Sequence, residues 1–350
     1  MRIRTKFAAA ALFLALAGLV SASACTAPER SPAPIKEQPA APKPITAEER
    51  VKWYQDCWDD FSDKKWNEFK NCYAANATSQ QVGYGPDVTG PDAIVGSSVE
   101  FAKSSPDVRG EGQLILVNGP HIASAFLLKG TNSGPMMGPD GKEMAATNKR
   151  FGLMFGHAID LDPAALKVVK ETGVQDSGTF ASQLGLSKMA ARPVMEKGAD
   201  APKIVIAKND ATEATNVDVE KAQLEAWNKH DAAAVDAYAA EDLVFHDMTG
   251  PKDTNKKQSS ELNKGYWKAF PDAKLNTSSI WGAGDYVVMI GTFEGTNDGD
   301  FPAMKLKKTG KKVSVPFLEI DRLEGGKLKE AWLFFDGGTF AAQLGVMPGK

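Results

Sequence analysis

The second half of this sequence has a sparse set of ionisable side chains placed where they could exchange a proton. Glu319 stands in an apolar run with Phe317 and Ile320, and a carboxyl group among apolar neighbours has a raised pKa that suits acid or base chemistry near neutrality. We expect Glu319 and His246 to be the catalytic candidates. His246 and Asp247 are adjacent on an expected strand, so they point to opposite faces. The alternatives are a hydrogen-bonded strand histidine and a solvent-facing Glu319.

A ten-residue segment occurs twice and carries a repeated acid. Residues 176–185 recur as 336–345 with eight identities. Such a repeat in only two copies indicates a duplicated globular domain, because solenoid units of about 20 to 50 residues need several stacked copies. Asp176 and Asp336 both precede Gly-Thr-Phe, and capping of a short terminal helix is a plainer explanation for them than catalysis.

Hydrophobic periodicity predicts the order α-α-β-α-β-β-β-β in both copies. In the second copy the expected helices cover 219–228, 232–240 and 256–270, and the expected strands cover 243–247, 273–281, 286–296, 312–323 and 327–335. Early landmarks of the two copies match at a spacing of 165 and the closing segments at 160, so the first copy has five more residues, expected around 134–141. Residues 204–206, in the joint, are a candidate for an added strand.

The order and spacing of several short motifs resemble the SnoaL-like polyketide cyclase branch of the NTF2-like superfamily. These motifs include Gly90-Pro91-Asp92-Ala93-Ile94, the segment from Gly326 to Trp332, and the closing Gln-Leu-Gly of each copy. The resemblance implies an α+β fold of two tandem cones, each a curved sheet wrapped on about three helices. We expect domains at 46–187 and 213–347, joined by a linker at 188–212.

The resemblance also implies a cyclase site, in which an Asp acts as acid and base and a His on the neighbouring strand assists. Counting back from the closing segment, these positions fall on Leu333 and Glu319 in the second copy and on about Gly173 and Ala158 in the first, so neither copy retains the pair. For the second copy we expect a ligand pocket lined by Tyr266, Phe317, Trp332, Leu333 and Phe335.

The start of the chain reads as an export signal. Basic residues precede an apolar run that ends in small residues before Cys25, which predicts a signal peptide over 1–24. Cys25 resembles a bacterial lipidation cysteine, and simple cleavage after Ala24 is the alternative. Residues 25–45 are rich in proline and predict an extended tether. We therefore expect an envelope protein held to a membrane by a lipid anchor alone.

Export changes the interpretation of Cys57 and Cys72, because oxidising compartments favour disulfides. We predict a Cys57–Cys72 bond, with two buried thiols as the alternative. Without residues 1–24 the chain keeps 38 basic and 44 acidic side chains, and this mildly acidic balance gives no footprint for nucleic acid. His121 and His157 lack partners at metal spacing, and no cofactor motif is present, so we expect neither a metal nor a cofactor.

Three functions remain open at this point. The first is a binding module that holds a small apolar or amphipathic molecule in one or both cavities. The second is an isomerase, cyclase or hydratase in the second copy that uses Glu319 or His246 as base, and the third is an interaction scaffold with filled cavities. Related domains often pair through their sheets, so we expect the two copies to form a pseudo-dimer within the chain.

Overall fold

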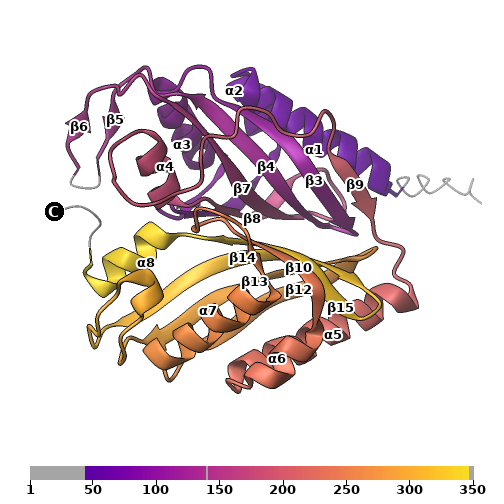
Figure 1. Cartoon of the computed structure of the whole chain (residues 1–350). Coiled ribbons are helices and arrows are strands. Elements are labelled where there is room, and N and C mark those ends of the chain that lie inside the picture. The colour runs from indigo at the N-terminus through magenta and orange to yellow at the C-terminus, as the bar shows by residue number, and fades with distance from the viewer. Residues whose placement is uncertain (1–43, 139–140, 347–350) are drawn as a thin grey trace, which may run out of the picture. The chain divides into compact units, whose positions relative to one another are not determined.

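The computed structural model describes residues 44–138 and 141–346. The predicted signal peptide, Cys25 and nearly all of the predicted tether lie outside the described residues. Two α+β domains follow, each a curved sheet with helices on one face (Figure 1). The predicted fold class is therefore confirmed.

The first domain packs its helices on a seven-stranded sheet. The helices are α1 (Ala47–Ser62), α2 (Trp66–Lys70), α3 (Pro91–Ser104) and α4 (Ser177–Gln183). The strands lie in the order β2 (Val88–Thr89), β1 (Tyr73–Val82), β8 (Val168–Val174), β7 (Arg150–Leu161), β4 (His121–Thr131), β3 (Arg109–Asn118) and β9 (Lys203–Ile206). A small hairpin of β5 (Met136–Met137) and β6 (Glu143–Met144) stands apart.

Local signals in the sequence account for the start of this domain. The Thr46 hydroxyl accepts the Glu49 amide N–H at 3.1 Å, and the Glu49 carboxylate accepts the Thr46 N–H at 2.7 Å. This capping box satisfies two backbone donors at the first turn of α1. The linker strand β9 pairs in parallel with β3, so the joint between the domains completes the sheet of the first domain.

The second domain repeats the plan with six strands in one sheet. Its helices are α5 (Ala211–Asn228), α6 (Ala232–Tyr238), α7 (Lys256–Ala269) and α8 (Gly337–Leu344), with a 3-10 turn, η1 (Pro302–Met304). The strand order is β11 (Thr254–Asn255), β10 (Ala239–Asp247), β15 (Lys327–Phe335), β14 (Lys312–Glu324), β13 (Tyr286–Thr296) and β12 (Lys274–Ala283). Helix α5 begins eight residues before the predicted start at 219, because Asp210 caps it by accepting the amides of Thr212 and Glu213.

Each sheet has an apolar layer on both faces. One cluster lies between the sheet and helices of the first domain, and a second lies in the same place in the second domain. A third cluster combines side chains of both sheets, among them Leu116, Ala125 and Val174 of the first domain with Val288, Leu318 and Phe334 of the second. Gly156 shows how close the sheets are, because a Cβ built there would lie 2.4 Å from the Phe334 ring.

The repeated acids Asp176 and Asp336 join the two domains by exchanging hydrogen bonds. Asp176 caps α4 by accepting the Thr179 amide at 2.7 Å and also accepts the Gly337 amide at 3.0 Å. Asp336 caps α8 in the same way and accepts both the amide and the hydroxyl of Ser177, at 2.9 and 2.7 Å. We call Asp176, Ser177, Asp336 and Gly337 the aspartate clamp. The repeated motif thus has a structural role in each copy and between the copies.

Replacement of Asp336 by alanine should destabilise the chain by about 2–4 kcal/mol, since it removes a helix cap and leaves the half-buried Ser177 amide without an acceptor. The Asp336→Asn variant keeps one acceptor oxygen and should lose less. Urea denaturation measures both. Asp200→Ala, at an exposed position, is the control. If Asp336→Ala and Asp200→Ala lowered the free energy of unfolding equally, the aspartate clamp would not stabilise the chain.

The structure confirms the predicted Cys57–Cys72 disulfide. It joins α1 to the turn between α2 and β1, and the two cysteines are 15 positions apart in the sequence. Both side chains are buried in the inner core of the first domain. The bond therefore restricts the unfolded chain between two segments that meet in the core of this domain.

Loss of this disulfide should lower the free energy of unfolding by about 3 kcal/mol, the value expected for closing a loop of this length. The Cys57→Ser, Cys72→Ser double variant and the parent can be compared by denaturant titration. Alkylation of the parent without reductant is the control. Two alkylatable thiols there, or identical denaturation midpoints, would contradict the expectation.

Candidate functional site

A partly open cavity of about 120 Å³ lies in the first domain, between helices α1 and α3 and the concave face of the sheet. Most of its wall is apolar, and aromatic rings predominate. The aromatic lining residues are Trp53, Tyr54, Trp58, Phe61, Phe69, Tyr73, Tyr84, Phe101 and Phe155. The disulfide partners Cys57 and Cys72 also form part of the wall.

A chain of buried polar groups crosses this apolar wall. Nε2 of His157 lies 2.6 Å from Oε1 of Glu171, and Nδ1 of His157 lies 2.5 Å from the Tyr54 hydroxyl. The Tyr73 hydroxyl donates to the same Glu171 oxygen at 3.0 Å, and the Tyr54 hydroxyl is 2.6 Å from Oγ of Ser124. The side chains of His157 and Glu171 are only 7% and 9% exposed, so each depends on these partners.

The electrostatics of the pair favour an ionised carboxylate. Burial by itself would raise the pKa of Glu171, but the hydrogen bonds from His157 and Tyr73 outweigh burial and hold the pKa below its usual value. The imidazole of His157 also packs against aromatic rings, with centroids 5.3 Å from Trp58 and 5.9 Å from Phe155. Both nitrogens of His157 are thus engaged and its ring orientation is fixed.

Strand register corrects the sequence-based placement of this site. His157 pairs with Gly173 across β7 and β8, and Glu319 pairs with Leu333 across β14 and β15. The position equivalent to Glu319 is therefore His157, and the prediction of Ala158 is wrong by one residue. Histidine does stand at the assisting position in the first copy.

The error comes from how the five extra residues are distributed. The connection from β4 to β7 covers 132–149, three residues more than 297–311 in the second domain. Six residues separate the paired Leu161 and Val168, and only four separate Leu323 and Leu328. The other two extra residues are thus in the β7–β8 turn, which shifts the alignment between the two strands.

The predicted site does not include Glu171, although the predicted position Gly173 is correct. Glu171 lies two residues before Gly173 on β8, so both positions belong to the same face of the strand. If the alignment is shifted by two residues, the Leu333 position becomes Ala331 or Phe335, neither of which is an acid. The same shift at Gly173 leads to Glu171. That comparison was the available signal in the sequence.

In the second domain, the structure separates the two predicted catalytic residues. Burial, and then the nearby Asp247 carboxylate, raise the pKa of Glu319 to about 7. Asp247 precedes Thr249, whose amide and hydroxyl donate to its carboxylate at 2.9 and 2.7 Å. The acid that faces Glu319 is therefore Asp247, as expected for the neighbour of His246 on the opposite strand face.

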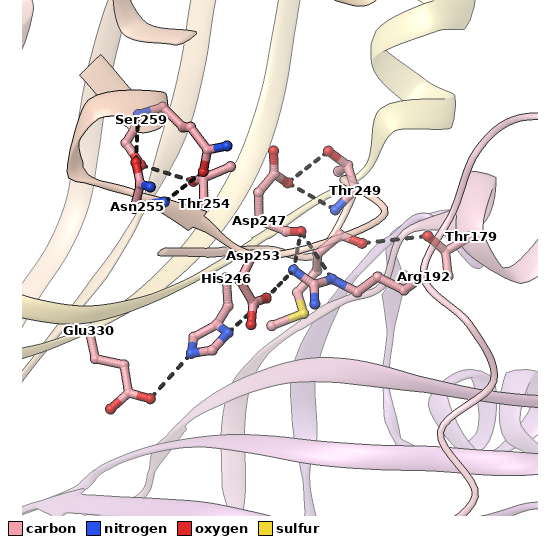
Figure 2. A network of polar contacts seen from close by, with 12 residues as sticks. Thr179, Arg192, His246, Asp247, Thr249, Asp253, Thr254, Asn255, Ser259 and Glu330 are labelled. Carbon is pink, nitrogen blue, oxygen red and sulfur yellow. Dashed lines mark hydrogen bonds and ion pairs between the residues drawn. The ribbon is translucent and has the colours of Figure 1, made fainter. Parts of the chain in front are cut away.

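His246 belongs to a surface network that includes the linker (Figure 2). Its Nδ1 lies 2.9 Å from Asp253 and its Nε2 lies 3.2 Å from Glu330, while Arg192 binds Asp253 at 2.8 Å. Burial lowers the pKa of His246, but the two carboxylates reverse that effect and the pKa is raised overall. These contacts give His246 a role in holding the linker on the second domain.

The predicted pocket residues of the second domain also divide between two faces. Tyr266, Phe317, Leu333 and Phe335 pack in the inner cluster between sheet and helices. Trp332 stacks on His246, with 5.2 Å between ring centroids, and joins the cluster shared by the two sheets. Trp332 therefore does not line an inner pocket, because adjacent strand residues alternate in direction.

Two further acids of the second domain are buried beside Glu319. Glu220 on α5 and Asp321 on β14 have no solvent exposure, and none of their carboxyl oxygens has a hydrogen-bond partner among the described residues. Burial, with repulsion from Glu319, raises the pKa of Glu220 to about 8, and burial likewise raises the pKa of Asp321 well above its usual value. Burial therefore disfavours the ionised form of both acids.

Glu220→Gln should stabilise the chain progressively as the pH rises from about 4.5 to about 8. Over this range the unfolded glutamate has lost its proton while the folded one retains it, so wild-type stability declines and the variant lacks this decline. Unfolding free energies measured from pH 4 to 9 test this. The matched control is Glu225→Gln, an exposed acid on the same helix; a pH-independent difference for Glu220→Gln would contradict the expectation.

The described part of the chain lacks two other features that would indicate a function, a membrane-spanning helix and a metal site. No described helix is long and apolar enough to cross a membrane. Among residues 44–138 and 141–346, no three His, Cys, Asp or Glu side chains are placed to hold a metal ion.

Comparison with known proteins agrees with the fold and the duplication. The model of the SnoaL-like polyketide cyclase family matches residues 48–184 and, a second time, residues 217–344. The chain belongs to this family. Its two SnoaL-like domains are the two copies described above, and the cavity with His157 and Glu171 is in the first of them. No curated protein matches the chain significantly.

Solved structures similar to this SnoaL-like protein each cover about two-fifths of it. AclR, a putative hydroxylase from Streptomyces galilaeus, is 27% identical over 39% of this chain and 85% of its own, with a TM-score of 0.36. IdmH, a putative polyketide cyclase from Streptomyces antibioticus, is 25% identical over 37% and 99%, with a TM-score of 0.33. A putative SnoaL-like polyketide cyclase from Jannaschia sp. CCS1 is 19% identical over 40% and 99%, with a TM-score of 0.36.

Proposed function

We propose that the first domain is a binding module that encloses one compact, largely apolar molecule in its aromatic-lined cavity. The buried His157–Glu171 pair contacts a polar group of that molecule. The cavity itself is the observation that carries this proposal, since it is concave and mostly apolar and has few polar groups, the usual features of a small-molecule site.

The size of the cavity limits the ligand. Sites for drug-sized ligands measure roughly 300–1,000 Å³, whereas an engineered apolar cavity of about 150 Å³ holds benzene. With about 120 Å³, the cavity of the first domain suits a molecule of one ring or of similar bulk. A multi-ring polyketide exceeds this volume.

The protonation properties of Glu171 favour binding over proton transfer. A general base works best when its pKa lies near the operating pH. The pKa of Glu171 is lowered by its hydrogen bonds, which makes this carboxylate a weak base. Because both nitrogens of His157 already have partners, the pair is better suited to hold a ligand than to exchange protons with it.

Acid–base catalysis in the second domain is the second candidate. The observation that favours it is the pKa of Glu319, about 7, which matches a general acid or base near neutrality. His246 does not assist there, since it binds Asp253 and Glu330 in the surface network. This candidate requires that Glu319→Gln stop the conversion of a compound that the wild-type chain transforms.

The rest of the chain suggests where this module is located and how its two domains are paired. We propose that residues 1–24 direct export and that Cys25 anchors the mature chain, and the Cys57–Cys72 disulfide supports an oxidising compartment. We also propose that the second domain takes the place of a partner subunit, supported by the apolar cluster that the two sheets share.

The cavity can be tested by filling it. Ser98 lines the cavity from α3, and Ser98→Trp should occupy the space, whereas Ser98→Ala should leave it open. Native mass spectrometry of the purified chain should detect a retained molecule, and thermal-shift measurements with single-ring compounds should show stabilisation. Both signals should survive in Ser98→Ala and be lost in Ser98→Trp; signals equal in the two variants would overturn binding in this cavity.

A further inference from the structure

We propose that the cavity of the first domain selects a compact organic cation, a ligand whose ammonium group is held between aromatic rings and the Glu171 carboxylate. This inference rests on the proposed function and specifies its ligand class. Three features of the cavity support it: its charge, its aromatic wall and an unpaired amide oxygen.

The residues that line the cavity include one acid and no permanently charged base. Glu171 is the single carboxylate among the lining residues, and no lysine or arginine lines the wall. His157 is the one group able to offset Glu171. An imidazole that accepts the Tyr54 proton at Nδ1 and donates to Glu171 from Nε2 fits both contacts, and our proposal takes His157 in this form, which leaves the carboxylate charge for a ligand.

The hydrogen-bond pattern leaves part of Glu171 free for that ligand. His157 and Tyr73 both hydrogen-bond to Oε1 of Glu171, so Oε2 accepts a hydrogen bond from neither, and the Ser79 hydroxyl is the further polar group beside this carboxylate. A carboxylate has room for about four acceptor contacts. A cationic group entering the cavity therefore finds an ionised oxygen that the protein does not use for its own pair.

The wall supplies the second attraction for a cation. Trp53, Trp58, Phe101 and Phe155 line the cavity on different elements, α1, α3 and β7. Aromatic faces attract a cation through the ring quadrupole, most strongly for Trp and where water is excluded, and cages of this kind recognise quaternary ammonium ligands. A wall of aromatic rings with one carboxylate fits an ammonium group better than an anion.

Gln81 provides an independent indication of a polar ligand group. Its side chain lines the cavity and the residue is 4% exposed, and its amide oxygen has no donor among the described residues. Leaving a buried acceptor unpaired costs about 1–3 kcal/mol. An N–H or O–H of the ligand would satisfy it, so the cavity presents two acceptors, Gln81 and Glu171, to its ligand.

Choline and its neutral isostere 3,3-dimethylbutan-1-ol are the test probes, since they have the same shape and differ in the positive charge. Isothermal titration of the purified chain should show choline binding about tenfold or more tightly than the isostere. Glu171→Gln should bring the ratio of the two affinities close to one. Glu68→Gln, which removes an exposed acid from α2, is the matched control and should leave the ratio unchanged.

The outcomes separate this inference from the proposed function. Equal affinities of the wild-type chain for both probes would overturn the cation preference while leaving the cavity a binding site. Absence of binding for both probes, together with no effect of single-ring compounds, would overturn the proposed function as well. The wild-type ratio decides the question even if Glu171→Gln does not fold, and circular dichroism of each variant reports on folding.

Discussion

Both faces of each sheet are apolar, and covering both is the constraint on which this structure depends. Helices cover the inner face in each domain, and the outer faces cover one another through the cluster that holds Leu318 and Phe334. An uncovered outer face would expose a large apolar patch to water, which soluble monomers avoid. The glycine at position 156, the shared aspartate clamp and the linker strand β9 all serve this arrangement. Duplication thus placed the cover for each sheet in the same chain.

The two domains treat buried acids in opposite ways within one fold. Glu171 keeps its charge because His157 and Tyr73 donate hydrogen bonds to it. Glu220 and Asp321 have no such donors among the described residues, and burial raises the pKa of both. The first domain therefore stabilises the charge of a carboxylate beside a cavity, whereas the second disfavours the charge of the acids in its interior. The shared architecture supports different chemistry in each copy.

Most of the fold could be predicted from the sequence, because strong periodicity and clear turns fix the order of helices and strands. The disulfide was also predictable, since the chain body has only Cys57 and Cys72. The site was harder, because the pairing of His157 with the strand that carries Glu171 depends on a turn two residues longer than its counterpart. Contacts between the linker and the second domain could not be predicted from neighbouring residues, because Arg192 binds Asp253, which is 61 positions away in the sequence. Burial of Glu220 depends on which face of α5 meets the sheet.

The disulfide has a consequence for the cavity that its effect on folding does not show. Cys57 and Cys72 form part of the cavity wall, so a covalent bond already fixes this wall while the cavity is empty. A preorganised wall loses little conformational entropy when a ligand enters. The affinity is then higher because less entropy is lost on binding, without any new contact. Reduction of the bond would remove this restraint on the wall, and the binding that we propose for the cavity should then weaken.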